Sequence, residues 1–231
     1  MSFIPSKTPW KTQLKEGLMI SSRLNKNNPL IFQVVLTVIY LVGMIGFSNP
    51  EWKEELQPTS GVILYISTFI MALASKNKLK FMVFMSIAFI IGFGTEAIGV
   101  NTGFLFGDYQ YGSNLGPKFL NVSVVIGLLW GVLALSAASI VDRIVLFNKA
   151  KVFFSALLML FVDVIMEPVA IANEFWTWSG TEVPTYNYIC WFLIALVLQM
   201  ILSKFRLNEK NKVYDTLLVL MVVFFSFLNL Y

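Results

Sequence analysis

The chain contains no histidine and only one cysteine, Cys190, among its 231 residues. Zinc and non-haem iron sites depend on these two residue types, so their scarcity argues against most metal chemistry and against a disulfide. Charged residues make up only 13% of the chain, whereas a soluble domain carries about a quarter. Hydrophobic residues make up 57%. This composition predicts an all-α polytopic membrane protein.

Seven apolar segments follow a basic N-terminal stretch, each close to the roughly 20 residues that a membrane-spanning helix needs. They are expected near 30–48, 59–75, 80–100, 119–140, 150–171, 187–203 and 214–231. Residues 30–231 are therefore interpreted as a single transmembrane helical domain. Residues 1–29 are expected to form a cytoplasmic segment, either a short helix on the membrane surface or a flexible tail.

Positive charges are divided unevenly between the two sides of the predicted bundle. All of the 17 Lys and Arg residues except Lys53 and Lys118 lie in the N-terminal stretch or in the connections after segments two, four and six. Because positive loops stay in the cytoplasm, the N-terminus is expected there and the C-terminus outside. Basic residues spread between membrane spans do not form the basic face that a nucleic acid would need.

Three carboxylic acids lie in the outer halves of the predicted spans: Glu96 in the third segment, and Asp163 and Glu167 in the fifth. An ionisable group at membrane depth costs about 2.5–3.5 kcal/mol, so it usually faces a cavity or a partner. Asp163 and Glu167 share a helix face, and their repulsion predicts that at least one is protonated and able to donate a proton. Pro168 predicts that the helix ends or kinks at Glu167, and an interfacial acid at a helix end is the alternative interpretation.

An aromatic loop punctuated by glycines follows each of these acid-bearing segments. Such rings are typical of interfacial belts, but desolvated aromatic faces also attract cations by about 2 kcal/mol or more. Both loops lead from an acid through aromatic-x-aromatic and glycine to asparagine and tryptophan, and this shared order indicates an internal repeat with a site between its halves. The candidate binding residues are Phe106, Tyr109, Tyr111, Asn121, Trp176, Trp178, Asn187 and Trp191.

Two stretches of the chain resemble the carotenoid biosynthesis membrane protein family. The first reads Gly-Phe-Leu-Phe-Gly-Asp-Tyr-Gln-Tyr-Gly-Ser-Asn-Leu-Gly-Pro-Lys at 103–118, with Glu96 before it and Asn121-Val122 and Trp130 after it. The second comprises Asp163, Glu167-Pro168-Val169-Ala170, Trp176, Trp178, Val183-Pro184, Asn187 and Trp191. Together they cover about half of the chain. Ser123 departs from the family pattern, in which proline is expected at this position.

The resemblance implies a carotenoid hydratase of the γ-carotene or bisanhydrobacterioruberin type. Such a hydro-lyase adds water across the terminal C=C of an acyclic carotenoid end and gives a tertiary alcohol. The reaction needs a strong acid, shelter for a tertiary cation and one water, but no metal and no redox cofactor. The expected partners are a lipophilic carotenoid, water and the lipid bilayer of the cell membrane, with other carotenoid-pathway enzymes as further candidates.

In this interpretation Glu167 or Asp163 protonates the alkene, and the other of the two or Glu96 deprotonates the water. The aromatic residues shield the cation, and Asn121 and Asn187 hold the water or the acids. A membrane carotenoid cyclase is the nearest alternative, because it also begins by protonating an alkene. A proton-coupled transporter and a non-catalytic subunit of a carotenoid enzyme complex are the others.

Overall fold

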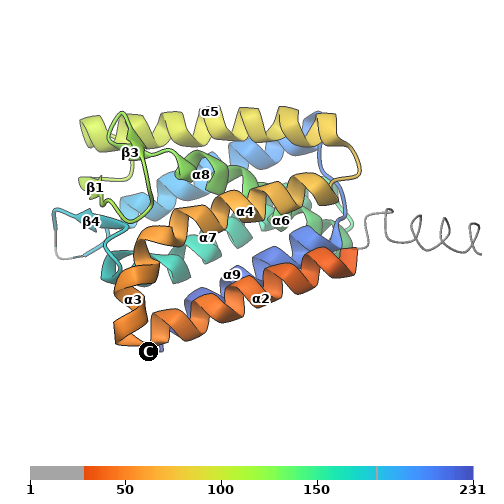
Figure 1. Ribbon diagram of the computed structural model, residues 1–231. Coiled ribbons are helices and arrows are strands. Elements are labelled where there is room, and N and C mark those ends of the chain that lie inside the picture. The colour runs from red at the N-terminus through yellow and green to blue at the C-terminus, as the bar shows by residue number, and fades with distance from the viewer. Residues whose placement is uncertain (1–28, 181, 231) are drawn as a thin grey trace, which may run out of the picture.

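Apolar runs of the predicted length form long helices that lie side by side in one bundle (Figure 1). The computed structural model describes residues 29–180 and 182–230. The helices are α2 (Pro29–Ser48), α3 (Pro50–Leu56), α4 (Ser60–Ala74), α5 (Lys78–Thr102), α6 (Val125–Ile144), α7 (Asn148–Ala172), α8 (Thr185–Lys204) and α9 (Lys212–Leu228), and a 3-10 turn, η1 (Gln57–Thr59), joins α3 to α4. The short strands are β1 (Tyr109–Tyr111), β2 (Lys118–Phe119), β3 (Val122–Ser123) and β4 (Trp176–Trp178).

Six stretches of the described chain are long and apolar enough to cross a membrane. Five are the single helices α2, α5, α6, α7 and α8, and the sixth runs from α3 through α4. Helix α9 is apolar as well but has 17 residues. The prediction of an all-α polytopic membrane protein is therefore confirmed. The expectation for residues 1–28 lies outside the residues that the structure describes.

Helix α6 lies at the centre of the bundle and contacts α4, α5, α7, α8 and α9. Its small residues allow this close packing. A Cβ added at Gly131 would lie 2.6 Å from the sulfur of Met85 on α5. The same holds with the two helices exchanged: a Cβ added at Gly92 of α5 would lie 2.3 Å from the indole of Trp130 on α6. Large side chains on each of these two helices therefore fill spaces left by glycines on the other.

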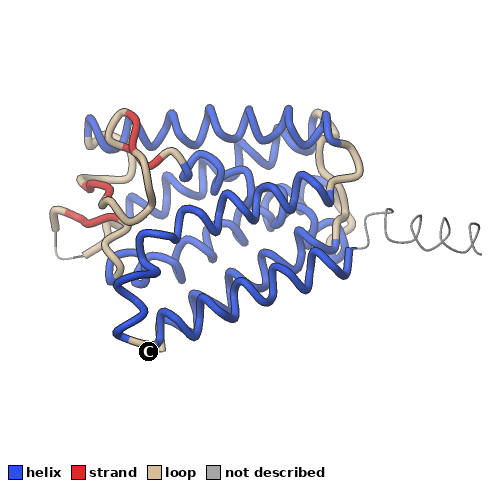
Figure 2. The backbone as a smooth tube through the Cα atoms, in the orientation of Figure 1, coloured by secondary structure: helices blue, strands red, loops and turns tan. Residues whose placement is uncertain are grey.

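The bundle has two chemically different ends (Figure 2). At one end, which we call the hairpin end, lie helix α3 and the four short strands. At the other, the basic end, the connections and the adjoining helix ends carry all Lys and Arg residues of the described chain except Lys53 and Lys118. The chain enters α2 at the basic end and leaves α9 at the hairpin end (Figure 1). The distribution of Lys and Arg residues predicts that the hairpin end faces the outside.

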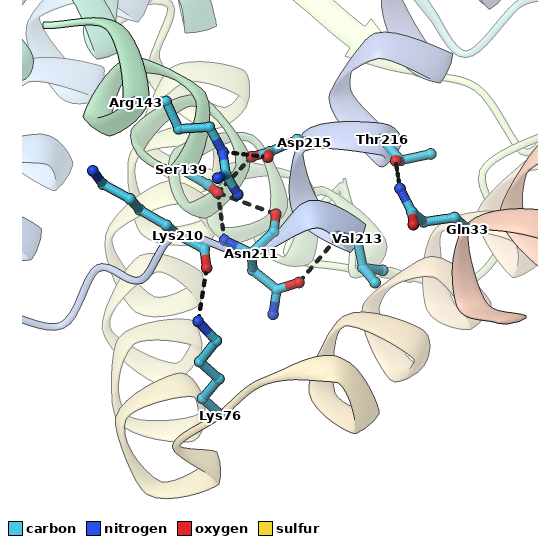
Figure 3. Close-up of polar contacts among 9 residues, drawn as sticks. All are labelled: Gln33, Lys76, Ser139, Arg143, Lys210, Asn211, Val213, Asp215 and Thr216. Atoms are coloured by element: carbon cyan, nitrogen blue, oxygen red, sulfur yellow. Dashed lines mark hydrogen bonds and ion pairs between the residues drawn. The ribbon is translucent and has the colours of Figure 1, made fainter. Parts of the chain in front are cut away.

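Polar contacts hold the helices together at the basic end (Figure 3). The guanidinium Nε of Arg143 on α6 lies 2.7 Å from a carboxylate oxygen of Asp215 on α9. Ser139 donates a 2.5 Å hydrogen bond to the same carboxylate and accepts one of 2.8 Å from the backbone N–H of Asn211. These contacts fix the start of α9 against α6, far along the bundle from the acids considered below.

One expected helix boundary is wrong. The predicted fourth span at 119–140 begins only at Val125, because Leu120 and Asn121 form the turn of a β2–β3 hairpin. Both have positive φ (49° and 64°), which a two-residue type I′ turn requires and which asparagine tolerates. The fifth span, expected at 150–171, agrees with α7. Of the two outcomes predicted at Pro168, an end of the helix does not occur, because α7 continues through Pro168 to Ala172. Proline removes only one helical N–H, and the backbone N–H of Asn173 still bonds to Val169 O at 3.0 Å.

Candidate active site

A two-stranded ladder joins the two acid-bearing hairpins at the hairpin end. Strand β1 follows α5 and pairs antiparallel with β4, which follows α7. Tyr109 lies opposite Trp178, and Tyr111 lies opposite Trp176. The two aromatic-x-aromatic motifs are therefore direct partners across one ladder, which lies beyond the C-terminal ends of α5 and α7.

Gly112 allows this ladder to close. Its N–H donates a 2.9 Å hydrogen bond to the carbonyl of Phe175, and a Cβ added here would lie 1.8 Å from the carbonyl oxygen of Glu174. We expect Gly112→Ala to destabilise the protein by about 1–3 kcal/mol, as overpacking does elsewhere, and to lower its thermal unfolding temperature in detergent. Gly180→Ala is the matched control, because the nearest atom there is 3.8 Å away. Equal unfolding temperatures for the two variants would show that the close approach at Gly112 is unimportant.

Glu96 is buried, and three aromatic side chains donate to it. Its Oε2 accepts hydrogen bonds from the hydroxyls of Tyr109 at 2.5 Å and Tyr111 at 2.8 Å, and its Oε1 accepts one from the indole of Trp130 at 3.3 Å. The pKa values of the Tyr109 and Tyr111 hydroxyls are raised far above the usual range of tyrosine. The main cause is burial, and the second is the nearby charge of Glu96. The two hydroxyls therefore keep their protons and remain hydrogen-bond donors at any ordinary pH.

Glu167 is held in an equivalent way by the second hairpin. Its Oε1 accepts hydrogen bonds from the indole N–H groups of Trp176 at 2.8 Å and Trp178 at 2.5 Å. Its other oxygen, Oε2, receives no hydrogen bond from the described part of the chain. Each acid thus binds both rings of the strand that follows its own helix, and Glu167 keeps one oxygen available.

The two glutamates line one small cavity of about 20 Å³. Such a volume holds about one water molecule when polar partners are present. The cavity is lined by Glu96, Phe106, Tyr109, Tyr111, Ile126, Leu129, Glu167, Trp176, Trp178, Asn187 and Trp191. Nine of the eleven residues that the sequence selected therefore meet around a single space, drawn from α5, α7, α8 and the two loops.

Aromatic rings make up much of the cavity wall. The rings of Tyr109 and Trp178 lie 5.0 Å apart at 36°, and those of Tyr111 and Trp176 lie 6.0 Å apart, edge to face. The indole of Trp191 on α8 stacks on that of Trp130 with the centroids 3.8 Å apart. These faces enclose the acids in a surface that can stabilise positive charge.

Asp163 lies outside this cavity, one helical turn before Glu167 on the same face of α7. It is fully buried, and neither of its carboxyl oxygens has a hydrogen-bond partner among the residues described. The amide nitrogen of Asn187, which does line the cavity, is also without a partner in this part of the chain. Buried polar groups are normally satisfied, so the Asn187 amide is a donor available to a molecule in the cavity.

Asn121 is not brought to the acids. It is exposed in the β2–β3 turn, and its side-chain amide donates to the side chain of Asn101 at 2.8 Å. Conversely, sequence reasoning left out Trp130, which binds Glu96, and the apolar wall residues Ile126 and Leu129. The shared order of the two hairpins does point to Trp130, because each hairpin ends in a tryptophan and the second of these, Trp191, is a candidate binding residue.

Within residues 29–180 and 182–230, no group of three or more cysteine, aspartate or glutamate side chains is arranged to hold a metal ion. The polar atoms of the cavity instead belong to two carboxylates and their neutral hydrogen-bond donors. This arrangement can give and accept protons and can position one small molecule between the acids.

Comparison with known proteins identifies relatives of the chain. Residues 59–231 match the model of the family described as "Carotenoid biosynthesis protein". A protein named bisanhydrobacterioruberin hydratase, from Haloarcula japonica, is 30% identical over 117 residues. That match covers 47% of this chain and 40% of the relative, so it spans less than half of either protein. No solved structure matches the chain.

Proposed function

This chain belongs to the carotenoid biosynthesis protein family, and from that premise we propose that it is a carotenoid hydratase of the cell membrane. It adds water to the terminal C=C of an acyclic carotenoid end group and forms a tertiary alcohol, without a cofactor. The observation that carries this proposal is the cavity for about one water molecule between two buried glutamates in an apolar bundle. The similarity to the Haloarcula hydratase supports it.

The reaction begins with proton transfer from Glu167. The proton leaves the free Oε2 and bonds to the less substituted carbon of the alkene, and the π electrons of the alkene form the new C–H bond. The other alkene carbon becomes a tertiary cation. The negative charge left on Glu167 is stabilised by the two indole N–H groups that bind its Oε1.

Water then attacks the cation and loses a proton to Glu96. This glutamate lines the same cavity, and its Oε1 accepts only the long bond from Trp130, so it has room to accept a second donor. The balance is one water consumed and one alcohol formed, with a proton moved from Glu167 to Glu96. The proton returns through the next water molecule in the cavity. Asp163, one turn deeper on α7, serves as a reserve proton donor to Glu167.

The aromatic wall protects the intermediate. The cation would lose a proton or react with bulk water if the cavity were open. The rings of the β1–β4 ladder stabilise it through their faces and admit only the water needed for addition. A cyclase would share the first step, but an internal double bond of the substrate would then trap the cation in place of water, so the mass of the product distinguishes the two reactions.

Expression of the protein in a host that accumulates lycopene tests this function. The expected result is a new pigment heavier than lycopene by one water, identified by chromatography and mass spectrometry. An isomer of unchanged mass would instead identify a cyclase. No new pigment, with the protein present in the membrane, would contradict a hydratase acting on this end group and would favour the transporter or subunit alternatives.

A further inference from the structure

A second cavity, which we call the groove, lies inside the bundle next to the acids. Its volume is about 90 Å³, and its walls come from α2, α4, α6, α7 and α9 together with Leu115 and Phe175 of the loops. Apart from Ser60 and the hydroxyl of Tyr40, its lining consists of hydrophobic side chains and glycines. No charged side chain of the described chain lines it, so it is unsuited to a diphosphate, a sugar or an ion.

The groove and the acid cavity share one wall. Ile126, Leu129 and Trp176 line both spaces. Trp176 is also a hydrogen-bond donor to Glu167. A molecule in the groove would therefore pack against the residue that positions the proton donor, with its end directed at the acid cavity.

A wider cavity borders the groove on another side. Phe47 on α2 and Val169 on α7 line both the groove and a wider cavity of about 510 Å³ at the hairpin end. The groove thus lies between the acid cavity and this wider cavity, and it borders each of them through shared side chains.

We propose that the groove binds the apolar chain of an acyclic polyene, in the segment adjacent to its reactive end group. This inference rests on the proposed function and adds the element that delivers the alkene to Glu167. The chain segment lies among side chains of α2, α4 and α9, the end group reaches past Trp176, and the rest of the molecule stays in the bilayer. A lipid acyl chain is the competing occupant, because it is equally apolar.

Gly43 on α2 gives a direct way to fill the groove. It lines the groove, and an added Cβ would lie 3.3 Å from the ring of Phe224 on α9. Gly43→Leu therefore places an isobutyl group where the chain would bind. Gly94→Leu on α5 is the matched control, because nothing lies within 4 Å of its added Cβ and both glycines lie inside helices. Leu64→Trp, from the opposite wall on α4, is a second filling variant in case Gly43→Leu does not fold.

The measurement is the polyene retained by the full-length protein when it is purified in detergent from lycopene-accumulating cells. The ratio of polyene absorbance to protein absorbance reports substrate and hydrated product alike, because hydration of an end leaves the conjugated chain intact. We expect the ratio to be at least about tenfold lower in Gly43→Leu and Leu64→Trp than in the wild type and in Gly94→Leu. Size-exclusion profiles verify that each variant is folded.

Two results would overturn the inference. One is equal retention by the filling variants and the wild type, and the other is no retained polyene in any of them, which would leave lipid as the occupant. Hydration measured in the same cells separates this inference from the proposed function. Retention that depends on the groove without any hydrated product would support the groove and contradict the hydratase, whereas wild-type hydration by a folded Gly43→Leu variant would do the reverse.

Discussion

Replacing Glu167 with glutamine is expected to abolish hydration while leaving the bundle folded. The amide oxygen can still accept both indole hydrogen bonds that Oε1 accepts now. The amide nitrogen takes the place of Oε2 and has no acidic proton to give to an alkene. Loss of a general acid costs roughly 10²–10⁴-fold in rate, which should leave no measurable alcohol in a pigment assay.

The matched variant for this test is Asp163→Asn on the same face of α7. Because Asp163 does not line the acid cavity, its replacement should slow turnover much less than loss of Glu167 does. Initial rates of alcohol formation in membranes, normalised to the protein present, make the comparison. The reverse order, with Asp163→Asn inactive and Glu167→Gln active, would transfer the role of proton donor to Asp163.

Replacing Glu96 with glutamine is expected to have the second largest effect. The variant loses the base that removes the proton from water, and a loss of about 10²–10⁴-fold is the range for such a group. It should also be less stable. With its oxygen facing the two tyrosine hydroxyls, the new amide nitrogen would face the indole N–H of Trp130, so that two donors oppose each other.

A double variant separates the two consequences. Adding Trp130→Phe to Glu96→Gln removes the opposing donor, so the double variant should lose less stability than the sum of the losses measured for the two single variants. Activity should stay lost, because the base is still missing. If Trp130→Phe restores both stability and turnover, Glu96 holds the loop in place and has no chemical role.

The helices could be predicted from hydropathy alone, but the start of the fourth span could not. Residues 119–124 are apolar enough to continue the helix that follows. Their conformation depends on two positive-φ residues, Leu120 and Asn121, and leucine carries no signal for such a turn. At Pro168 the local rule for proline is outweighed by the hydrogen bonds of the next turn, which involve the side chain of Asn173 as well as the backbone.

The acids and aromatic residues of the candidate site could be selected from the sequence because charge is rare in this chain, so each buried acid stands out. Asn121 is a candidate binding residue only because of its place in a motif. Its side chain contacts Asn101 and not the acids. The groove had no sequence signal, since its walls come from five helices far apart in the chain. Apolar residues that line a cavity cannot be distinguished by sequence from those that pack or face lipid.

The central claim is that an acid of this protein protonates the alkene and that solvent water then adds to the cation. Its most direct test is turnover of an acyclic carotenoid by the purified protein in deuterated water enriched in oxygen-18, with the product analysed by mass spectrometry. The account predicts one carbon-bound deuterium and one oxygen-18 for each end hydrated, and no labelled product from Glu167→Gln. A product that carries deuterium but no oxygen, or an alcohol without carbon-bound deuterium, would contradict it.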